Sequence, residues 1–282
     1  GWQDLYICTT SKNSGVPEAG KSLTHPFSYN DLDSLKTIFS EHPGGVAAVI
    51  MEPMNVEFPE EGFLQSVKDL AHQHGALLIF DEIITGCRFA KGGAQEYFGV
   101  TPDLATFGKG LANGMPFSAI VGSRSIMQLM EDIFFSFTFG GETLSLAAAL
   151  TTLKKIQQEP VIETIAEHGE FLLAGTQSLI DQYALSDCLS IKGHPAWSFL
   201  VFQDARGSTQ WEMKTFWMQE ILARGILSFG THNLSYAHTK QDIEKLLAVY
   251  DEVFSLLQQH LETGTLKDAM QCEVLKPLFS VR

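Results

Sequence analysis

Short apolar runs alternate with amphipathic helical patterns along the first half of the chain. The runs at residues 46–51 (VAAVIM) and 76–80 (ALLIF) have the length and continuity of buried strands. Residues 103–107 and 117–122 are two further strand candidates. Between the first two runs, apolar residues recur at the spacing of one helix face: Phe63, Leu64, Val67, Leu70 and Ala71. Gly75 marks the end of that helix. Strands joined through helices in this way predict a mainly parallel sheet covered on both faces.

The pattern changes in the second half. Helices are predicted at 145–158 and 161–183, separated by Pro160, and another at 211–224. Strands are predicted at 189–191, 197–202 and 226–229. A long last helix begins at Thr239, which forms a capping-box pair with Asp242. We therefore expect two domains: an α/β domain over residues 1–158 and an α+β domain over residues 159–282.

Composition indicates which classes of binding partner and which cellular compartment to expect. With 45% apolar residues among 282, the chain can fill a core. The formal net charge of −14 repels the phosphates of nucleic acids and anionic lipid heads, so neither is an expected partner. The strand-sized apolar runs are too short to span a bilayer. The four cysteines lie tens of residues apart, which predicts a reduced, cytoplasmic protein.

Ionisable side chains follow two of the predicted buried strands. Asp81 and Glu82 come directly after the run 76–80, and Lys109 stands between Gly108 and Gly110 just after the strand candidate 103–107. Taken singly, these residues are typical of a capped strand end and a solvated loop. Together they lie at the carboxyl edge of the expected sheet, where open α/β sheets bind ligands. A pyridoxal phosphate enzyme needs this pair: a lysine to form a Schiff base, and a carboxylate to keep the pyridine nitrogen protonated.

Four stretches then resemble one family. They are VAAVIMEPM (46–54), LLIFDEIITGCR (77–88), PDLATFGKGLANGMPFSAIVG (102–122) and SFTFGGETLSLAAA (136–149). Residues 1–4 and 235–239 also look like family segments. The chain resembles the class III aminotransferases of pyridoxal phosphate fold type I, most closely the glutamate-1-semialdehyde 2,1-aminomutase group. The implied fold is α/β, with a partial, mainly parallel large domain (1–158) that carries the Schiff-base lysine, and an α+β C-terminal small domain (159–282).

The resemblance assigns roles residue by residue. Lys109 matches the Schiff-base lysine, Asp81 the partner of the pyridinium nitrogen, and Ile83 the aliphatic side chain packed against the ring. Thr138 matches the threonine that reaches the cofactor phosphate of the neighbouring subunit, which implies a homodimer with shared active sites. Glu52 matches an active-site glutamate whose role varies between members.

Two neighbouring motif residues are interpreted as structural supports, namely Glu82 and Arg88. Two departures from the family pattern stand out. The family's phosphate-gripping loop and ring-stacking aromatic residue match no part of the chain and fall upstream of Gly1. Many members also have Gly-Asn-Pro where this chain has Gly141-Glu142-Thr143, so Thr143 is expected to cap the following helix in place of the proline.

The implied activity is transfer of an amino group between an amine or amino acid and an oxo acceptor, with pyridoxal 5′-phosphate as cofactor. Two alternatives remain open at this point. The first is glutamate-1-semialdehyde 2,1-aminomutase activity, an intramolecular transfer that uses the same catalytic pair. The second is a catalytically incomplete fragment or partner subunit.

Other polar and aromatic groups yield weaker hypotheses. His72 and His74 lie two apart on a predicted helix and point in different directions, so no metal site is predicted. His232 and Asn233 are expected in a polar loop, either beside the substrate entrance or in a plain turn. Four phenylalanines flank Thr138 and are interpreted as core and dimer packing: Phe134, Phe135, Phe137 and Phe139.

Overall fold

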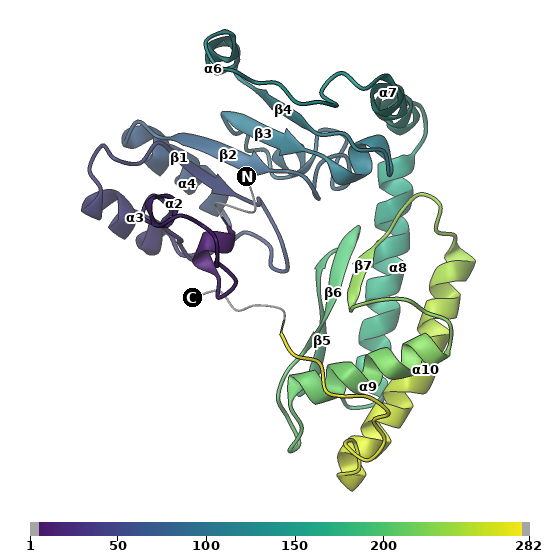
Figure 1. The fold of residues 1–282 in the computed structure, drawn as a ribbon. Coiled ribbons are helices and arrows are strands. Elements are labelled where there is room, and N and C mark those ends of the chain that lie inside the picture. The colour runs from purple at the N-terminus through teal and green to yellow at the C-terminus, as the bar shows by residue number, and fades with distance from the viewer. Residues whose placement is uncertain (1–5, 278–282) are drawn as a thin grey trace.

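A computed structural model describes residues 6–277 (Figure 1); the family-like segment at residues 1–4 lies outside them. The first unit, residues 6–158, is built on a four-stranded sheet in the order β1-β2-β3-β4. Its strands are β1 (Ala48–Met51), β2 (Leu77–Asp81), β3 (Leu104–Phe107) and β4 (Ala119–Gly122). β1, β2 and β3 run parallel, whereas β4 is antiparallel to β3. The mainly parallel sheet is therefore confirmed.

Helices α3 (Leu32–Glu41) and α4 (Phe63–Gln73) cover one face of this sheet. Leu78 and Phe80 of β2 are fully buried there with Val67 of α4, because alternate strand residues point to the same face. On the other face, Ile50 is 46% exposed. The expectation of helices on both faces is thus not met within the described residues. The β2–β3 connection contains only the four-residue α5 (Ala94–Tyr97) instead of a full crossover helix.

Short elements complete the first unit: η1 (Ile7–Thr9), α2 (Glu18–Lys21), η2 (Lys109–Ala112), α6 (Arg124–Met127) and η3 (Gln128–Glu131). Helix α7 (Thr143–Gln158) ends it. The expectation that Thr143 caps α7 was wrong. Glu142 is the N-cap, and its carboxylate accepts hydrogen bonds from the backbone N–H groups of Leu144 and Ser145. A carboxylate satisfies two otherwise unpaired N–H groups and also interacts favourably with the helix dipole.

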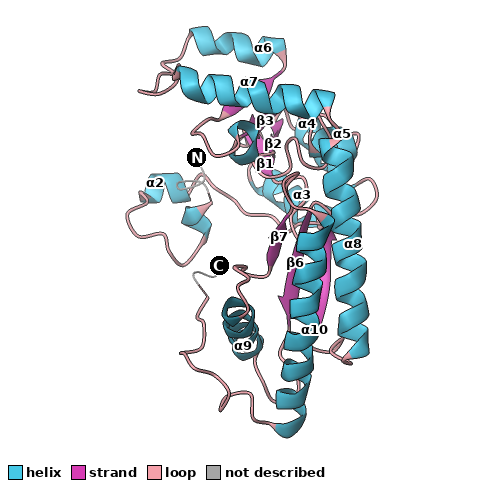
Figure 2. Cartoon of the chain, turned by 90° about the vertical axis from the view of Figure 1, so that its right-hand side faces the viewer, coloured by secondary structure: helices cyan, strands magenta, loops and turns pink. Residues whose placement is uncertain are grey.

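The second unit follows a helix break at Glu159–Pro160. It contains the antiparallel sheet β5-β6-β7, with β5 (Leu189–His194), β6 (Trp197–Phe202) and β7 (Thr231–Asn233). Helices α8 (Val161–Gln182) and α10 (Lys240–Thr263) run side by side along this sheet (Figure 2), and α9 (Gln210–Ala223) lies across its lower end in Figure 1. The predicted capping box of α10 is confirmed at Thr239 and Asp242. The domain boundary at residue 158 stays a prediction.

One strand assignment was wrong. The run 226–229 is not a strand, and Leu227 and Phe229 within it are exposed. Gly230 adopts a positive φ of 86°, and pairing with β6 extends beyond it through Thr231, His232 and Asn233. The apolar pattern pointed to residues 226–229, but the strand begins only after the bend at Phe229 and Gly230.

Candidate active site

Three neighbouring parallel strands end at the same edge of the first sheet. Asp81, the last residue of β2, pairs in register with Thr106 of β3, and Met51 of β1 pairs with Phe80. Glu52 directly follows β1, and Lys109 lies two residues beyond β3. The carboxyl ends of parallel strands carry the ligand sites of open α/β sheets. The structure therefore brings Glu52, Asp81 and Lys109 to one edge.

The Asp81 carboxylate is held in a fixed orientation. Its Oδ1 accepts a hydrogen bond of 3.0 Å from the backbone N–H of Ile83 and lies 3.4 Å from the hydroxyl oxygen of Thr106. Sequence reasoning did not select Thr106, although it lies in the same motif as Lys109. The available signal was strand register, because residues paired across two parallel strands have neighbouring side chains.

Lys109 begins the η2 turn in a backbone conformation that is unusual for a non-glycine residue, with φ of 45°. Leu111 and Ala112 are buried and anchor the turn, which packs against α7. The Lys109 side chain remains exposed. A strained backbone position at a sheet edge costs roughly 1–3 kcal/mol and is typical of functional sites. The turn therefore presents the lysine amine away from the core.

Ile83 lies next to this turn. A Cβ atom built on Gly108 would be 3.6 Å from Ile83 Cγ2, so the isoleucine side chain borders the glycine that precedes Lys109. The end of β2 thus carries a carboxylate at Asp81, and the loop that follows it places the apolar side chain of Ile83 beside the lysine turn.

Glu52 is the third ionisable group at this edge. Burial is the largest cause of its raised pKa, and the Asp81 charge adds to the rise. The Asn55 amide, which donates a hydrogen bond to Glu52 Oε2, and the charge of Lys109 act in the opposite direction. Asn55 is a second contact that sequence reasoning missed. These influences indicate that Glu52 lies within electrostatic reach of both Asp81 and Lys109.

The carboxylate of Glu82, the residue after Asp81, has a structural role. The Glu82 side chain is fully buried and accepts hydrogen bonds from the backbone N–H groups of Ala94 (2.6 Å) and Gln95 (2.9 Å) and from the Thr85 hydroxyl (2.7 Å). It therefore fixes the start of α5 to the loop after β2. Arg88 bonds to backbone carbonyls of the second unit, at Ala196 and Leu234.

Thr138 lies apart from these groups. It is exposed in the segment between η3 and α7, and within residues 6–277 no interaction links it to Glu52, Asp81 or Lys109. The core role expected for its phenylalanine neighbours was wrong, because within this chain all four side chains are exposed, Phe134 to 95%. Further large apolar side chains are exposed in the segment 133–139 and along α7. Together with the phenylalanines we call them the 133–153 surface: Ile133, Phe134, Phe135, Phe137, Phe139, Leu144, Leu146, Leu150 and Leu153.

The polar-loop expectation for His232 and Asn233 was also wrong, since both belong to β7. His232 is buried, and its Nδ1 and Nε2 lie 2.9 Å from the Ser198 hydroxyl and 2.7 Å from the Tyr250 hydroxyl. Burial lowers the pKa of His232 to about 4 and raises that of Tyr250. This network joins β6, β7 and α10 inside the second unit.

The burial of His232 predicts a pH dependence of stability. Because its pKa is lower in the folded protein than the ordinary value of 6.5, its full contribution is present above pH 6.5 and is lost as the pH falls towards 4. The loss amounts to at most about 3 kcal/mol. Urea unfolding between pH 7 and 4.5 should show a flatter pH dependence for His232→Gln than for the wild type. His238→Gln, at an exposed position, is the control. Equal slopes for wild type and His232→Gln would contradict the prediction.

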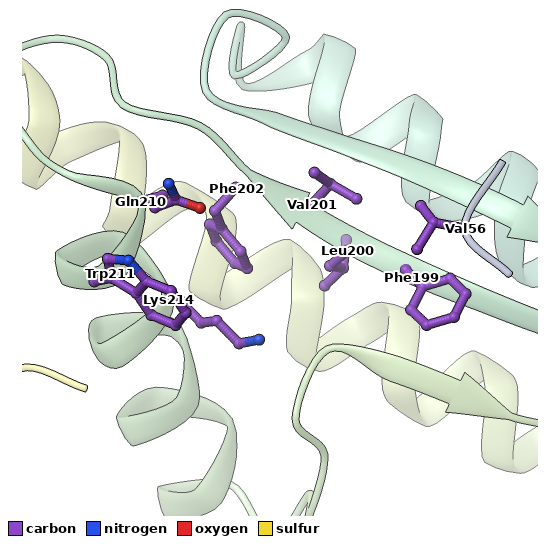
Figure 3. A pocket seen from close by; sticks show the side chains of 8 residues that line it. All are labelled: Val56, Phe199, Leu200, Val201, Phe202, Gln210, Trp211 and Lys214. Carbon is purple, nitrogen blue, oxygen red and sulfur yellow. The ribbon is translucent and has the colours of Figure 1, made fainter. Parts of the chain in front are cut away.

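A hollow of about 190 Å³ lies between β6 and the first turns of α9 (Figure 3). Val56 of the first unit borders it, together with Phe199 of β6 and Trp211 and Lys214 of α9. Burial lowers the pKa of Lys214. None of the five predicted site residues lines this hollow, so it is separate from the edge that carries Lys109.

Comparison with known proteins identifies the family. The model of the family "Aminotransferase class-III" matches residues 14–233, which is most of the chain. The chain belongs to the class III aminotransferases. This class III chain is 32% identical over 252 residues to the 3-aminobutyryl-CoA aminotransferase of Cloacimonas acidaminovorans, covering 86% of itself and 60% of that protein. It is 36% identical over 272 residues to glutamate-1-semialdehyde 2,1-aminomutase 2 of Lachnoclostridium phytofermentans, covering 89% and 63%.

Solved structures agree with the fold. The FumI protein of Sphingopyxis sp. MTA144, determined in its PLP internal aldimine form, superposes with a TM-score of 0.80 at 28% identity, over 89% of this chain and 61% of that one. This class III chain thus spans about 60% of the length of the relatives it matches. The expected fold, α/β with a mainly parallel sheet as in the pyridoxal phosphate transaminases, is confirmed.

Proposed function

We propose that the protein containing this chain is a pyridoxal-phosphate-dependent aminotransferase that moves an amino group between an amine or amino acid and an oxo acceptor. The observation that carries the proposal is that Lys109 and the oriented carboxylate of Asp81 lie at the same edge of the sheet. Family membership and relatives named as aminotransferases support it.

The donor set at this edge suits pyridoxal 5′-phosphate. Lys109 offers an exposed amine for covalent attachment to the cofactor aldehyde. Asp81 offers a carboxylate oxygen to the ring nitrogen, because its hydrogen bond from the Ile83 N–H fixes its direction. Ile83 offers an apolar surface beside Gly108 for one face of the ring. When bound, the cofactor supplies an electron sink that weakens the Cα–H bond of an attached amine.

Each residue then has a defined task. Lys109 would hold the cofactor through its Nζ, and once the substrate amine takes that place the freed Nζ would accept the proton from the substrate Cα. Asp81 keeps a proton on the ring nitrogen through its negative charge. Glu52, held by Asn55, places a further acidic group beside the substrate.

We also propose a homodimer whose active sites are shared. The 133–153 surface supports this, because many large apolar side chains exposed in one stretch of a chain are typical of protein interfaces. Thr138 lies within that surface, and in a two-fold dimer it would reach the cofactor phosphate of the partner. The expected partners are otherwise a small-molecule amino donor and oxo acceptor.

No helix within residues 6–277 is long and apolar enough to cross a membrane. We propose a cytoplasmic location, which is supported by the wide spacing of the four cysteines along the sequence.

An aminomutase is the second candidate, favoured by the relatives named glutamate-1-semialdehyde 2,1-aminomutase at 35–38% identity. The same lysine and aspartate serve both reactions, so the test must use substrates. We expect amino transfer from a panel of amino acids and amines to oxo acids, with little product from glutamate-1-semialdehyde alone. Rearrangement of glutamate-1-semialdehyde without an added acceptor would assign the mutase. Absence of both activities in a cofactor-loaded protein would favour the catalytically incomplete alternative.

A further inference from the structure

Arg88 joins the loop that carries Asp81 to the second unit. One nitrogen of its guanidinium, Nη1, donates hydrogen bonds to two backbone carbonyls, at 2.7 Å to Leu234 and 3.2 Å to Ala196. Ala196 lies in the turn between β5 and β6, and Leu234 directly follows β7. No carboxylate in residues 6–277 forms an ion pair with Arg88, and burial lowers its pKa. The charged group therefore serves these two carbonyls.

The next residue strengthens the same junction. The Phe89 ring stacks on the ring of His194, with centroids 3.8 Å apart and planes at 14°. Tyr97 meets His194 edge-on at 4.8 Å. His194 is buried, and its Nδ1 accepts a hydrogen bond of 3.1 Å from the Ala196 N–H. Arg88 and Phe89 thus both contact one short segment of the second unit, residues 194–196.

The loop between Asp81 and Phe89 is tightly wound by backbone hydrogen bonds. The Gly86 N–H donates to the Glu82 carbonyl at 2.9 Å, and the N–H groups of Arg88 and Phe89 donate to the Thr85 carbonyl at 3.2 and 3.3 Å. A Cβ atom on Gly86 would collide with the Phe107 ring. The loop therefore packs against the strand that leads to Lys109.

We propose that Arg88 is a positioning residue: by holding residues 81–89 against the second unit, it fixes the Asp81 carboxylate and the Ile83 side chain beside Lys109. The inference rests on the proposed roles of Asp81 and Ile83. It assigns to the second unit a direct part in the geometry of the cofactor ring. Arginine suits this position because a guanidinium remains charged when buried and presents its donors in a rigid plane.

The test compares Arg88→Met with Arg206→Met in the holoenzyme. Arg206 also bonds a carbonyl, of Ala184, and additionally Asp187, but both partners lie within the second unit. The ¹⁵N chemical shift of labelled cofactor reports the protonation of the ring nitrogen. Amide hydrogen exchange in the cofactor-free protein reports how often the hydrogen bonds of the loop open.

Arg88→Met should speed amide exchange at Ile83 and Gly86 by at least about tenfold and move the ring nitrogen towards its unprotonated chemical shift. It should also lower kcat by at least about tenfold with a smaller change in KM. Arg206→Met should lower the melting temperature without these changes.

Arg88→Lys provides a second variant if Arg88→Met does not fold, and it should change the same readouts in the same direction. An Arg88 variant with wild-type loop exchange, ring-nitrogen shift and kcat would overturn the proposal, even if it melted earlier. Asp81→Asn separates this failure from failure of the proposed function. If Asp81→Asn left the ring nitrogen unchanged, the role of Asp81 itself would be wrong. If only Asp81→Asn changed it, the coupling through Arg88 would be wrong.

Discussion

Replacement of Asp81 by alanine should lower kcat by at least about a thousandfold, which corresponds to about 4 kcal/mol of transition-state stabilisation. The variant loses the negative charge that keeps a proton on the ring nitrogen, and without that proton the ring accepts electrons poorly. Covalent attachment at Lys109 does not need this charge. We therefore expect the cofactor absorbance to persist while single-turnover and steady-state rates collapse.

Asp81→Asn is the matched control for shape. Its amide keeps an oxygen that can accept the Ile83 N–H, as Asp81 does at 3.0 Å, but it carries no charge. Similar losses in the alanine and asparagine variants would assign the effect to charge and not to loop geometry. Near-normal turnover in either variant would remove the main support for the proposed mechanism.

Two inactive variants should restore activity when they are combined in one dimer. Lys109→Ala removes the covalent attachment, and Thr138→Glu places a negative charge where the partner's cofactor phosphate is expected. In a mixed dimer, one site has lost its lysine and also receives the altered residue 138. The other site keeps its own Lys109 and receives an intact Thr138, so mixing and re-equilibration should yield up to one working site per mixed dimer.

The choice of glutamate at position 138 matters. Thr138→Ala removes a single hydrogen bond to a charged group, worth roughly 1.5–3 kcal/mol, and is expected only to weaken the enzyme. The mixed dimers are confirmed by differently tagged subunits, and each variant mixed with itself is the control. If tagged mixed dimers gave no more activity than either parent, Thr138 would have to act within its own subunit.

The sequence predicts the placement of residues that directly follow a strand. Asp81 and Lys109 each follow a short apolar run, and parallel pairing brings such ends to one edge whatever the details of the helices. The sequence also predicts the Thr239–Asp242 capping box, because this motif depends on local hydrogen bonds alone.

The remaining features depend on contacts between distant segments. Local sequence does not record that β4 runs antiparallel to β3, because an apolar strand has the same pattern in either direction. The hydrogen-bond network of His232 reaches Ser198, which is 34 positions away in the sequence, and Tyr250, which is 18 positions away. The partners of Arg88 are backbone carbonyls more than 100 residues later, and any residue type supplies a carbonyl.

Borohydride reduction of the holoenzyme, followed by proteolysis and mass spectrometry, tests the central claim most directly. Reduction makes the lysine–cofactor link permanent, so the modified peptide identifies the attachment point. We expect the adduct on the peptide that contains Lys109 and its absence from a Lys109→Ala protein treated in the same way. An adduct on Lys91 or Lys154 instead would contradict the assignment of the active site to the edge formed by Glu52, Asp81 and Lys109.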